Sequence, residues 1–228
     1  MRISEIFYSI QGEGLLTGVP SAFVRASGCN LRCTFCDTPY ASWQPEGNEI
    51  SPTAIVDTIS HFPARHVVVT GGEPLLAPDL PDLLRILDSQ GWHITVETAG
   101  TLFQDISCDL ASISPKLGSS TPHDREGGKF ALMHENSRWR PEVVRAFMDA
   151  HDYQLKFVID RPEDFAEVQE MLRQLDEFDP HRVLLMPQGQ TPEELAKRST
   201  FLSDICKEYG YRYCQRLHID LYGGKRGT

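Results

Sequence analysis

The stretch Cys29-Asn-Leu-Arg-Cys33-Thr-Phe-Cys36-Asp37-Thr38 carries three cysteines at C-x3-C-x2-C spacing within eight residues. Thiolates bind soft metals and iron–sulfur clusters, and close spacing lets one loop present several sulfurs to one inorganic centre. A cubane cluster has four irons, so three thiolates leave one iron free to bind a small molecule. A structural zinc site would instead need a fourth ligand from elsewhere in the chain.

Predicted strands and helices alternate on both sides of this cysteine loop. We expect strands at residues 22–28, 66–70, 94–97, 110–113, 154–159 and 182–186, with a last extended run at 211–221. We expect helices starting at Ser51-Pro52 and spanning 80–89, 141–150, 162–175 and 192–209. Alternation of this kind favours parallel pairing through right-handed crossovers. Because a closed barrel needs about eight strands, the predicted fold class is α/β, a partial, open (β/α) barrel of about six parallel strands with a short C-terminal extension.

Length and composition favour one globular domain over residues 1–228. No apolar run approaches the roughly 20 residues that span a bilayer, and the N-terminus has no signal-peptide pattern, so we expect a cytoplasmic protein. The net charge of −10 argues against sequence-independent binding of nucleic acid, which depends on clustered cations. The scattered Cys108, Cys206 and Cys214 are typical of packed small hydrophobes.

Polar motifs follow the predicted strands at their carboxyl ends. They are Gly71-Gly72-Glu73-Pro74, Thr98, Ser114-Pro115-Lys116 and Pro187-Gln188, in addition to the cysteine loop. Since the carboxyl ends of strands in barrels and open α/β sheets share one face, these motifs are expected to converge on one site.

Two segments before the cysteine loop allow more than one interpretation. The loop Gln11-Gly12-Glu13-Gly14 fits an ordinary turn or a close approach of backbone to a ligand. Arg25, inside the first strand, fits an edge residue or a buried clamp for an anion. Residues 118–140 lack periodicity and fit a flexible excursion over one face.

Together, the C-x3-C-x2-C loop and the Gly71-Gly72-Glu73-Pro74 segment resemble the radical S-adenosylmethionine (SAM) superfamily. The order and spacing of further segments resemble the 7-carboxy-7-deazaguanine synthase family, which makes the deazapurine precursor of queuosine. These segments are Gln11–Gly14, Thr17–Pro20, Cys36–Thr38, His66–Pro74, Glu97–Thr98, Ser114–Lys116 and His218, and they cover nearly the whole chain.

The resemblance implies that Cys29, Cys33 and Cys36 hold a [4Fe–4S] cluster and that SAM chelates the fourth iron. The residues implied to bind SAM are Phe35, Gly71, Gly72, Glu73, Glu97, Ser114, Lys116 and Gln188. The implied reaction starts when the reduced cluster cleaves SAM to a 5′-deoxyadenosyl radical. That radical removes hydrogen from C6 of 6-carboxy-5,6,7,8-tetrahydropterin, after which the ring contracts, ammonia is lost and SAM is regenerated.

The resemblance also implies a substrate site in the N-terminal extension, residues 1–22, and the C-terminal extension, residues 211–228. The implied substrate contacts are Ile10, Gln11, Gly12, Glu13, Arg25, Gly71, His218 and Thr228. The tail after Leu221 departs from the family pattern because it is longer and rich in glycine. Thr38 is the expected ligand of the Mg²⁺ ion beside the substrate. Asp37 is expected either to hydrogen-bond to a ligand of this ion without binding the ion itself, or to cap a helix.

The implied partners are the pterin substrate, a flavodoxin or ferredoxin that donates electrons, and a second copy of the chain in a homodimer. No nucleic acid or membrane is implied. One rival interpretation is a radical SAM activase that abstracts hydrogen from a glycine of a partner protein. Another is a non-catalytic zinc-binding module built on the three cysteines and a histidine.

Overall fold

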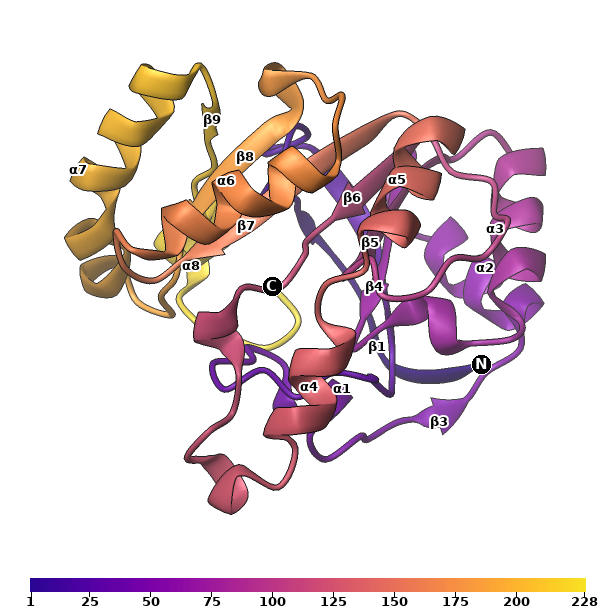
Figure 1. Cartoon of the computed structure of the whole chain (residues 1–228). Coiled ribbons are helices and arrows are strands. Elements are labelled where there is room, and N and C mark those ends of the chain that lie inside the picture. Colours follow the sequence, from indigo (N-terminus) through magenta and orange to yellow (C-terminus); the bar gives the residue numbers. More distant parts are fainter.

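The computed structural model describes residues 1–228 and contains one open sheet of nine strands (Figure 1). Its strands are β1 (Arg2–Ile10), β2 (Pro20–Ala26), β3 (Asn48–Glu49), β4 (His66–Gly71), β5 (His93–Thr98), β6 (Leu110–Ile113), β7 (Tyr153–Ile159), β8 (Val183–Pro187) and β9 (Arg212–Tyr213). The order across the sheet is β3-β1-β2-β4-β5-β6-β7-β8-β9. Neighbours from β2 to β9 pair in parallel, whereas β1 pairs antiparallel with β2 and β3. The predicted open α/β architecture is confirmed, with an antiparallel pair added at one edge.

Helices cover the outer face of this sheet (Figure 1). They are α2 (Pro52–Ser60), α3 (Leu80–Ser89), α5 (Pro141–Ala150), α6 (Asp164–Gln174) and α7 (Pro192–Tyr209), each close to its predicted range. In α3, every leucine at helical spacing is fully buried in the main core. Two of these helices, α2 and α7, begin with a proline in the first turn and a hydroxyl that caps the helix. The capping residue is Ser51 for α2 and Thr191 for α7.

Shorter helices lie in the connections. They are α1 (Pro39–Ser42), α4 (Ala131–Ser137) and α8 (Leu217–Tyr222), with 3-10 turns at Pro74–Leu76, Gly118–Ser120, Arg125–Gly128 and Pro180–Arg182.

Two of these helices differ from the sequence expectation. The run 211–221 was expected to be extended, but it holds only the short β9 before α8 begins. Residues 118–140, expected to be irregular, contain α4. Neither helix has a side-chain cap at its start, so both lack a local start signal. Tertiary contacts replace that signal: Leu217 N–H donates to the Gly12 carbonyl (2.9 Å), and His134 of α4 is fully buried.

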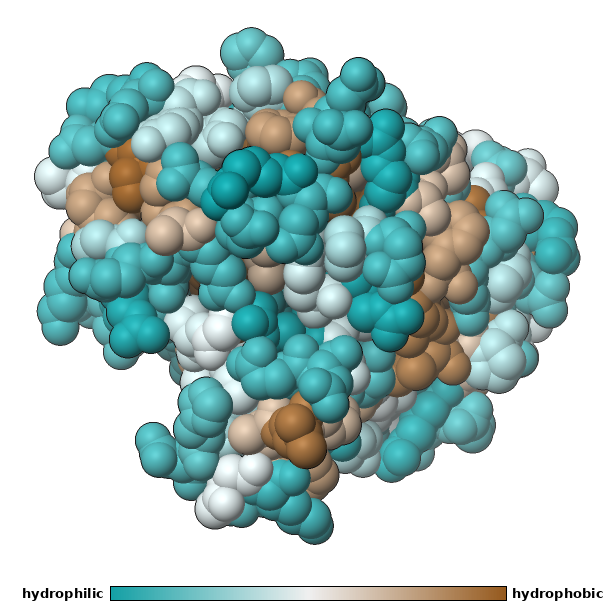
Figure 2. All heavy atoms as spheres, viewed as in Figure 1, coloured by the Kyte–Doolittle hydropathy of each residue, from teal (hydrophilic) through white to brown (hydrophobic).

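Alternate strand residues face opposite sides of the sheet, as the pleat requires. In β4, Val67 and Val69 pack in the main core with the helices, while Val68 and Thr70 line a cavity on the inner face. The surface in Figure 2 is mostly hydrophilic, with a hydrophobic patch at the position of α4, where Leu132 is 74% exposed. No helix has the length and apolar character needed to cross a membrane.

Candidate active site

A cavity of about 370 Å³ opens at the inner face of the sheet. Each of the six main parallel strands contributes an inward-facing residue to its wall: Arg25, Thr70, Glu97, Ser112, Lys156 and Met186. The register places Arg25 beside Thr70 and Glu97 beside Ser112, so these side chains form a band across the sheet. Five of the six are polar, which makes the inner face a binding surface rather than a second core.

The cysteine loop closes one end of the cavity, and all three of its thiols line the wall. Backbone hydrogen bonds hold the loop: Gly28 N–H donates to the Ala41 carbonyl, and Glu73 N–H donates to the Gly28 carbonyl, both at 2.8 Å. Trp43 supports the loop from outside because its indole Nε1 donates to the Cys33 carbonyl (3.0 Å). The guanidinium of Arg125 stacks on the Trp43 ring at 3.8 Å.

The donor set fits an iron–sulfur cluster. Burial raises the pKa of Cys29 to about 12 and that of Cys33 to about 11, so both thiols hold their protons at neutral pH until a metal centre displaces them. No three Cys, His, Asp or Glu side chains converge tightly enough to hold a single metal ion. Three thiols on one loop match the three-thiolate ligation of an iron–sulfur cluster, whereas a closed structural zinc site would need a fourth ligand.

Gly71 and Gly72 pack directly on the start of the cysteine loop. A Cβ on Gly72 would lie 2.2 Å from the Gly28 carbonyl oxygen, and one on Gly71 would lie 2.2 Å from the Ala26 carbonyl oxygen. Glycine is therefore required here to bring the end of β4 against the loop.

Glu73, predicted to bind SAM, does not line the cavity. Its carboxylate is buried and accepts hydrogen bonds from Thr98 Oγ1 (3.0 Å), Ala99 N (2.9 Å) and Leu75 N (3.3 Å). In this structure it ties the ends of β4 and β5 together, and its contact with SAM stays a prediction.

The other residues predicted to bind SAM line the cavity, namely Phe35, Gly71, Gly72, Glu97, Ser114, Lys116 and Gln188. Lys116 Nζ donates to Ser114 Oγ at 2.8 Å, which fixes the direction of both side chains. Glu97 Oε2 accepts from Thr70 Oγ1, also at 2.8 Å. The cavity wall next to the cysteines thus presents a cation, a hydroxyl and a carboxylate.

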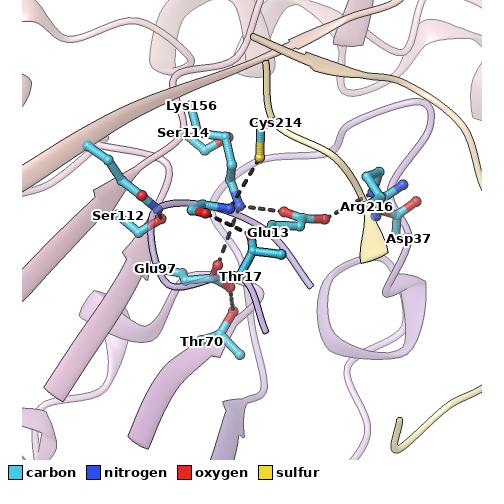
Figure 3. A network of polar contacts seen from close by, with 12 residues as sticks. Glu13, Thr17, Asp37, Thr70, Glu97, Ser112, Ser114, Lys156, Cys214 and Arg216 are labelled. Carbon is cyan, nitrogen blue, oxygen red and sulfur yellow. Dashed lines mark hydrogen bonds and ion pairs between the residues drawn. The ribbon is translucent and has the colours of Figure 1, made fainter. Parts of the chain in front are cut away.

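Glu13 is the centre of an ion-pair network in the cavity (Figure 3). Its Oε2 accepts from Lys156 Nζ at 2.5 Å, and its Oε1 accepts from Arg216 Nε at 2.9 Å. Lys156 also lies 3.4 Å from Glu97 Oε1, and Arg216 pairs with Asp37 Oδ2 at 2.5 Å.

This network keeps Glu13 ionised. Burial alone would raise the pKa of Glu13, but the charges of Lys156 and Arg216 outweigh burial and hold that pKa well below its usual range. His218 Nε2 lies 3.9 Å from Glu13 Oε1 and adds a weaker contribution. Glu13 therefore presents an acceptor-only carboxylate to the cavity.

Arg25 is not an edge residue, because its strand β2 pairs with β1 on one side and β4 on the other. Only 17% of its side chain is exposed. Its Nε donates to Glu5 Oε1 (2.6 Å), and its terminal nitrogens make no hydrogen bond to the protein. The same Glu5 oxygen accepts from the Tyr40 hydroxyl (2.9 Å). These contacts orient the fork of the guanidinium and leave it free to bind an anion.

The C-terminal tail, residues 223–228, crosses this end of the cavity and lines it as far as Thr228. Arg226 holds it there by donating to Glu5 Oε2 (3.3 Å) and Glu46 Oε2 (3.0 Å) and by stacking on the Tyr40 ring at 3.9 Å. The longer tail of this chain therefore still reaches the site.

Thr38 and Asp37 also line the cavity. Thr38 is the N-cap residue of α1, but its side chain makes no capping bond. Its hydroxyl contacts only Cys36 Sγ, at 3.9 Å, and can therefore serve as an oxygen ligand. Asp37 does not cap that helix. Its carboxylate instead accepts from Arg216 and from Gln190 Nε2 (3.0 Å).

The structure brings nearly all the predicted site residues to one cavity, with Ile10 and Glu73 outside its wall. Sequence reasoning missed Lys156, Arg216, Glu5 and Tyr40. Lys156 had a signal, since it interrupts the otherwise apolar end of strand 154–159 at an alternate position. Arg216 had none, because its partners Glu13 and Asp37 are far away along the chain.

Comparison with known proteins agrees with this geometry. The model of the radical SAM superfamily matches residues 23–202. A 7-carboxy-7-deazaguanine synthase from Rhodopirellula baltica is 44% identical over 229 residues, with 100% of this chain and 89% of the relative covered. One from Halobacterium salinarum is 45% identical over 232 residues, with 97% and 90% covered. These matches set aside both the zinc module and the glycyl-radical activase.

Among solved structures, the chain is similar to the crystal structure of QueE from Escherichia coli. The TM-score is 0.70 over 95% of this chain and 94% of that chain. At 24% sequence identity this likeness concerns the fold alone, and it agrees with the predicted open α/β architecture. The sequence matches, which span almost the full length of both partners, carry the assignment further. The chain belongs to the radical SAM superfamily and, within it, to the 7-carboxy-7-deazaguanine synthase family.

Proposed function

We propose that this chain converts 6-carboxy-5,6,7,8-tetrahydropterin to 7-carboxy-7-deazaguanine, as a radical SAM carbon–nitrogen lyase of queuosine precursor biosynthesis. One observation carries the proposal: the three thiols, an ionised carboxylate and a free guanidinium fork share one cavity. The carboxylate and the guanidinium suit the polar groups of a carboxylated pterin. The thiols suit the cluster that a radical reaction at the pterin ring requires.

The substrate matches the polar end of the cavity. Its aminopyrimidinone edge offers N–H donors, which the acceptor-only carboxylate of Glu13 can receive. Its carboxylate suits the terminal nitrogens of Arg25, which are free to make a bidentate pair. Gln11, Gly12, Gly71, His218 and Thr228 complete the proposed contacts. The contact of Ile10, which ends β1 outside the cavity wall, stays a prediction.

The family uses a [4Fe–4S] cluster and SAM. Cys29, Cys33 and Cys36 would hold the cluster, since their thiols are free and line the cavity. When bound and reduced, the cluster and SAM supply a 5′-deoxyadenosyl radical that removes hydrogen from the substrate.

For SAM we propose the contacts Phe35, Gly71, Gly72, Glu73, Glu97, Ser114, Lys116 and Gln188. The Lys116 ammonium, directed by Ser114, suits the carboxylate of the methionyl group. The Glu97 carboxylate, oriented by Thr70, suits hydroxyl donors. Glu73 would act by holding the ends of β4 and β5, or accept from SAM after its own partners rearrange.

We further propose that Thr38 and the substrate carboxylate are ligands of Mg²⁺. Asp37 would contact these ligands without binding the ion itself. The proposed reductant is a flavodoxin or ferredoxin, and the proposed assembly is a homodimer of single-domain chains. Residues 1–22 and 211–228 form the extensions that carry Glu13, His218 and the tail to the substrate.

An anaerobic assay tests the function directly. The reconstituted protein is given dithionite, SAM, Mg²⁺ and the carboxylated tetrahydropterin, and the product is identified by mass. We expect 7-carboxy-7-deazaguanine, with release of ammonia. Unchanged pterin beside a reducible cluster that cleaves SAM would refute the substrate while leaving the superfamily intact.

A further inference from the structure

We propose that Lys156 and Arg216 are positioning residues that hold Glu13, and with it the pterin, in register with the SAM end of the cavity and with the cysteine loop. This inference rests on the proposed function. It assigns a role to two cations that no motif identified, and Figure 3 shows that they lie on either side of Glu13.

Lys156 connects the two halves of the cavity. Its ammonium lies 2.5 Å from Glu13 Oε2, on the substrate side, and 3.4 Å from Glu97 Oε1, on the SAM side. Only 6% of its side chain is exposed, so these two carboxylates are its main partners. Because Lys156 lies in the middle of β7, which pairs with β6 on one side and β8 on the other, it fixes the spacing between the two carboxylates.

Arg216 makes the second connection, from Glu13 to the cysteine loop. Its Nε donates to Glu13 Oε1 at 2.9 Å, and another of its nitrogens donates to Asp37 Oδ2 at 2.5 Å. A third nitrogen donates to the Gly189 carbonyl, which anchors the guanidinium to the loop after β8. The planar fork of arginine fixes both distance and direction in a way that lysine cannot.

The charges explain why two cations are needed. Glu13, Glu97 and Asp37 bring three carboxylates to one small cavity, and His218 is the only other basic side chain beside Glu13. Without Lys156, no cation would lie between Glu13 and Glu97 to offset their repulsion, and Glu13 would be held by Arg216 alone. The pterin would then still meet Glu13, but at a variable distance from the 5′-carbon of SAM, where hydrogen transfer tolerates little displacement.

The first test measures binding without the cluster. Equilibrium dialysis of the cluster-free protein with 6-carboxypterin, a stable analogue of the substrate, gives a Kd for each variant. Lys156→Met should weaken binding by about tenfold or more, as expected when a buried carboxylate loses its cation. Lys156→Arg, which keeps the charge, should recover most of the affinity.

The second test measures coupling in the reconstituted enzyme. We expect Lys156→Met and Arg216→Met to raise the amount of 5′-deoxyadenosine released per 7-carboxy-7-deazaguanine formed, with kcat falling more than the rate of SAM cleavage. A purely structural defect would reduce the amount of active enzyme and leave this ratio unchanged. Arg198→Met is the matched control, because it breaks a 2.5 Å pair with Asp160 just after β7 but outside the cavity.

A double variant keeps the test decisive if Lys156→Met fails to fold. Glu13→Gln combined with Lys156→Met removes both charges together. If Lys156 acts through Glu13, the double variant should bind 6-carboxypterin within about threefold of Glu13→Gln alone. A further loss of tenfold would mean that Lys156 contacts the pterin itself and would overturn the positioning role.

The wild-type protein separates the two proposals. Absence of pterin turnover by wild type refutes the proposed function. Normal turnover by wild type, with Lys156→Met retaining both the wild-type Kd and the wild-type product ratio, refutes only the inference about positioning.

Discussion

At the scale of single residues, Arg25 is oriented by Glu5 while its terminal nitrogens stay free. We expect Arg25→Ala to weaken binding of the carboxylated pterin by about tenfold to a hundredfold, because a charge-assisted bidentate pair is lost. Uncoupled cleavage of SAM should continue at the wild-type rate. Anaerobic product analysis measures both activities, and equal loss of both would show that Arg25 is structural. Arg25→Lys is the control, since it keeps the charge without the fork.

The ionisation of Glu13 makes the free energy of unfolding depend on pH in the acid range. Its pKa in the folded chain lies below the usual value of 4.5, because Lys156 and Arg216 outweigh the effect of burial. Its contribution to stability is therefore fully present above about pH 4.5 and is lost as pH falls toward the folded pKa. Near neutral pH, Glu13→Gln should destabilise the cluster-free protein by about 3 kcal/mol, because two buried cations lose their partner.

Urea unfolding of wild type and Glu13→Gln across the acid range tests this expectation. The difference between the two unfolding free energies should shrink steadily below about pH 4.5. A difference that stays constant down to strongly acid pH would mean that Glu13 is not the titrating group.

At the scale of elements, the segment 118–137 supports the cysteine loop through His134 of α4. The Arg32 N–H donates to His134 Nδ1 (3.1 Å), so the proton lies on Nε2, which is 2.9 Å from Ser120 Oγ. Burial lowers the pKa of His134 to about 4, which keeps the ring neutral in this role. Through these contacts the segment supports the cysteine loop.

We expect His134→Ala to leave buried polar groups without partners and to cost about 1–3 kcal/mol of stability. Hydrogen exchange at the Arg32 amide and across 118–137 should speed up, and less iron should be retained after reconstitution. His123→Ala is the control, because His123 is an exposed histidine of the same segment. Unchanged exchange at Arg32 would contradict the supporting role.

The C-terminal tail depends on Arg226, whose pairs with Glu5 and Glu46 are partly exposed. Exposed pairs are worth about 0.2–1 kcal/mol each, so Arg226→Ala should raise KM for the pterin by about two- to fivefold and leave kcat nearly unchanged. Because salt screens such pairs, the wild-type KM should approach that of the variant at high ionic strength. Steady-state kinetics at two salt concentrations checks this, with Arg212→Ala as an unpaired control on β9. A KM independent of salt would contradict a role of the Arg226 ion pairs in holding the tail.

At the scale of the whole molecule, elements whose signals are local could be predicted from the sequence. The amphipathic leucines of α3 and the β-branched run of β4 each mark their own element. Helix α8 could not be found this way, because its first amide bonds to Gly12, about two hundred residues earlier in the chain. The same holds for α4, which has no cap and depends on the fit of His134 under the cysteine loop.

The residues of the candidate site also differ in whether a local sequence signal identifies them. The cysteines and glycines form short motifs and could be recognised from spacing alone. Lys156 and Arg216 act through ion pairs that form only in the folded chain, since Glu13 and Arg216 lie near opposite ends of the sequence. Charge compensation inside a cavity leaves no periodic pattern in a sequence, so these residues become visible only in three dimensions.

The position of the Trp43 indole beside the cysteine loop has a consequence for the fluorescence of the protein. It bonds to the Cys33 carbonyl, whereas Trp92 is buried in the main core and Trp139 bonds to Gln174 on α6. An iron–sulfur centre absorbs where indole emits, so cluster assembly should quench tryptophan fluorescence chiefly through Trp43. Trp43→Phe should remove the largest single share of this quenching while the cluster absorbance persists, and unchanged quenching in that variant would assign the signal to the other tryptophans. Assembly of the centre can then be followed in real time through tryptophan emission.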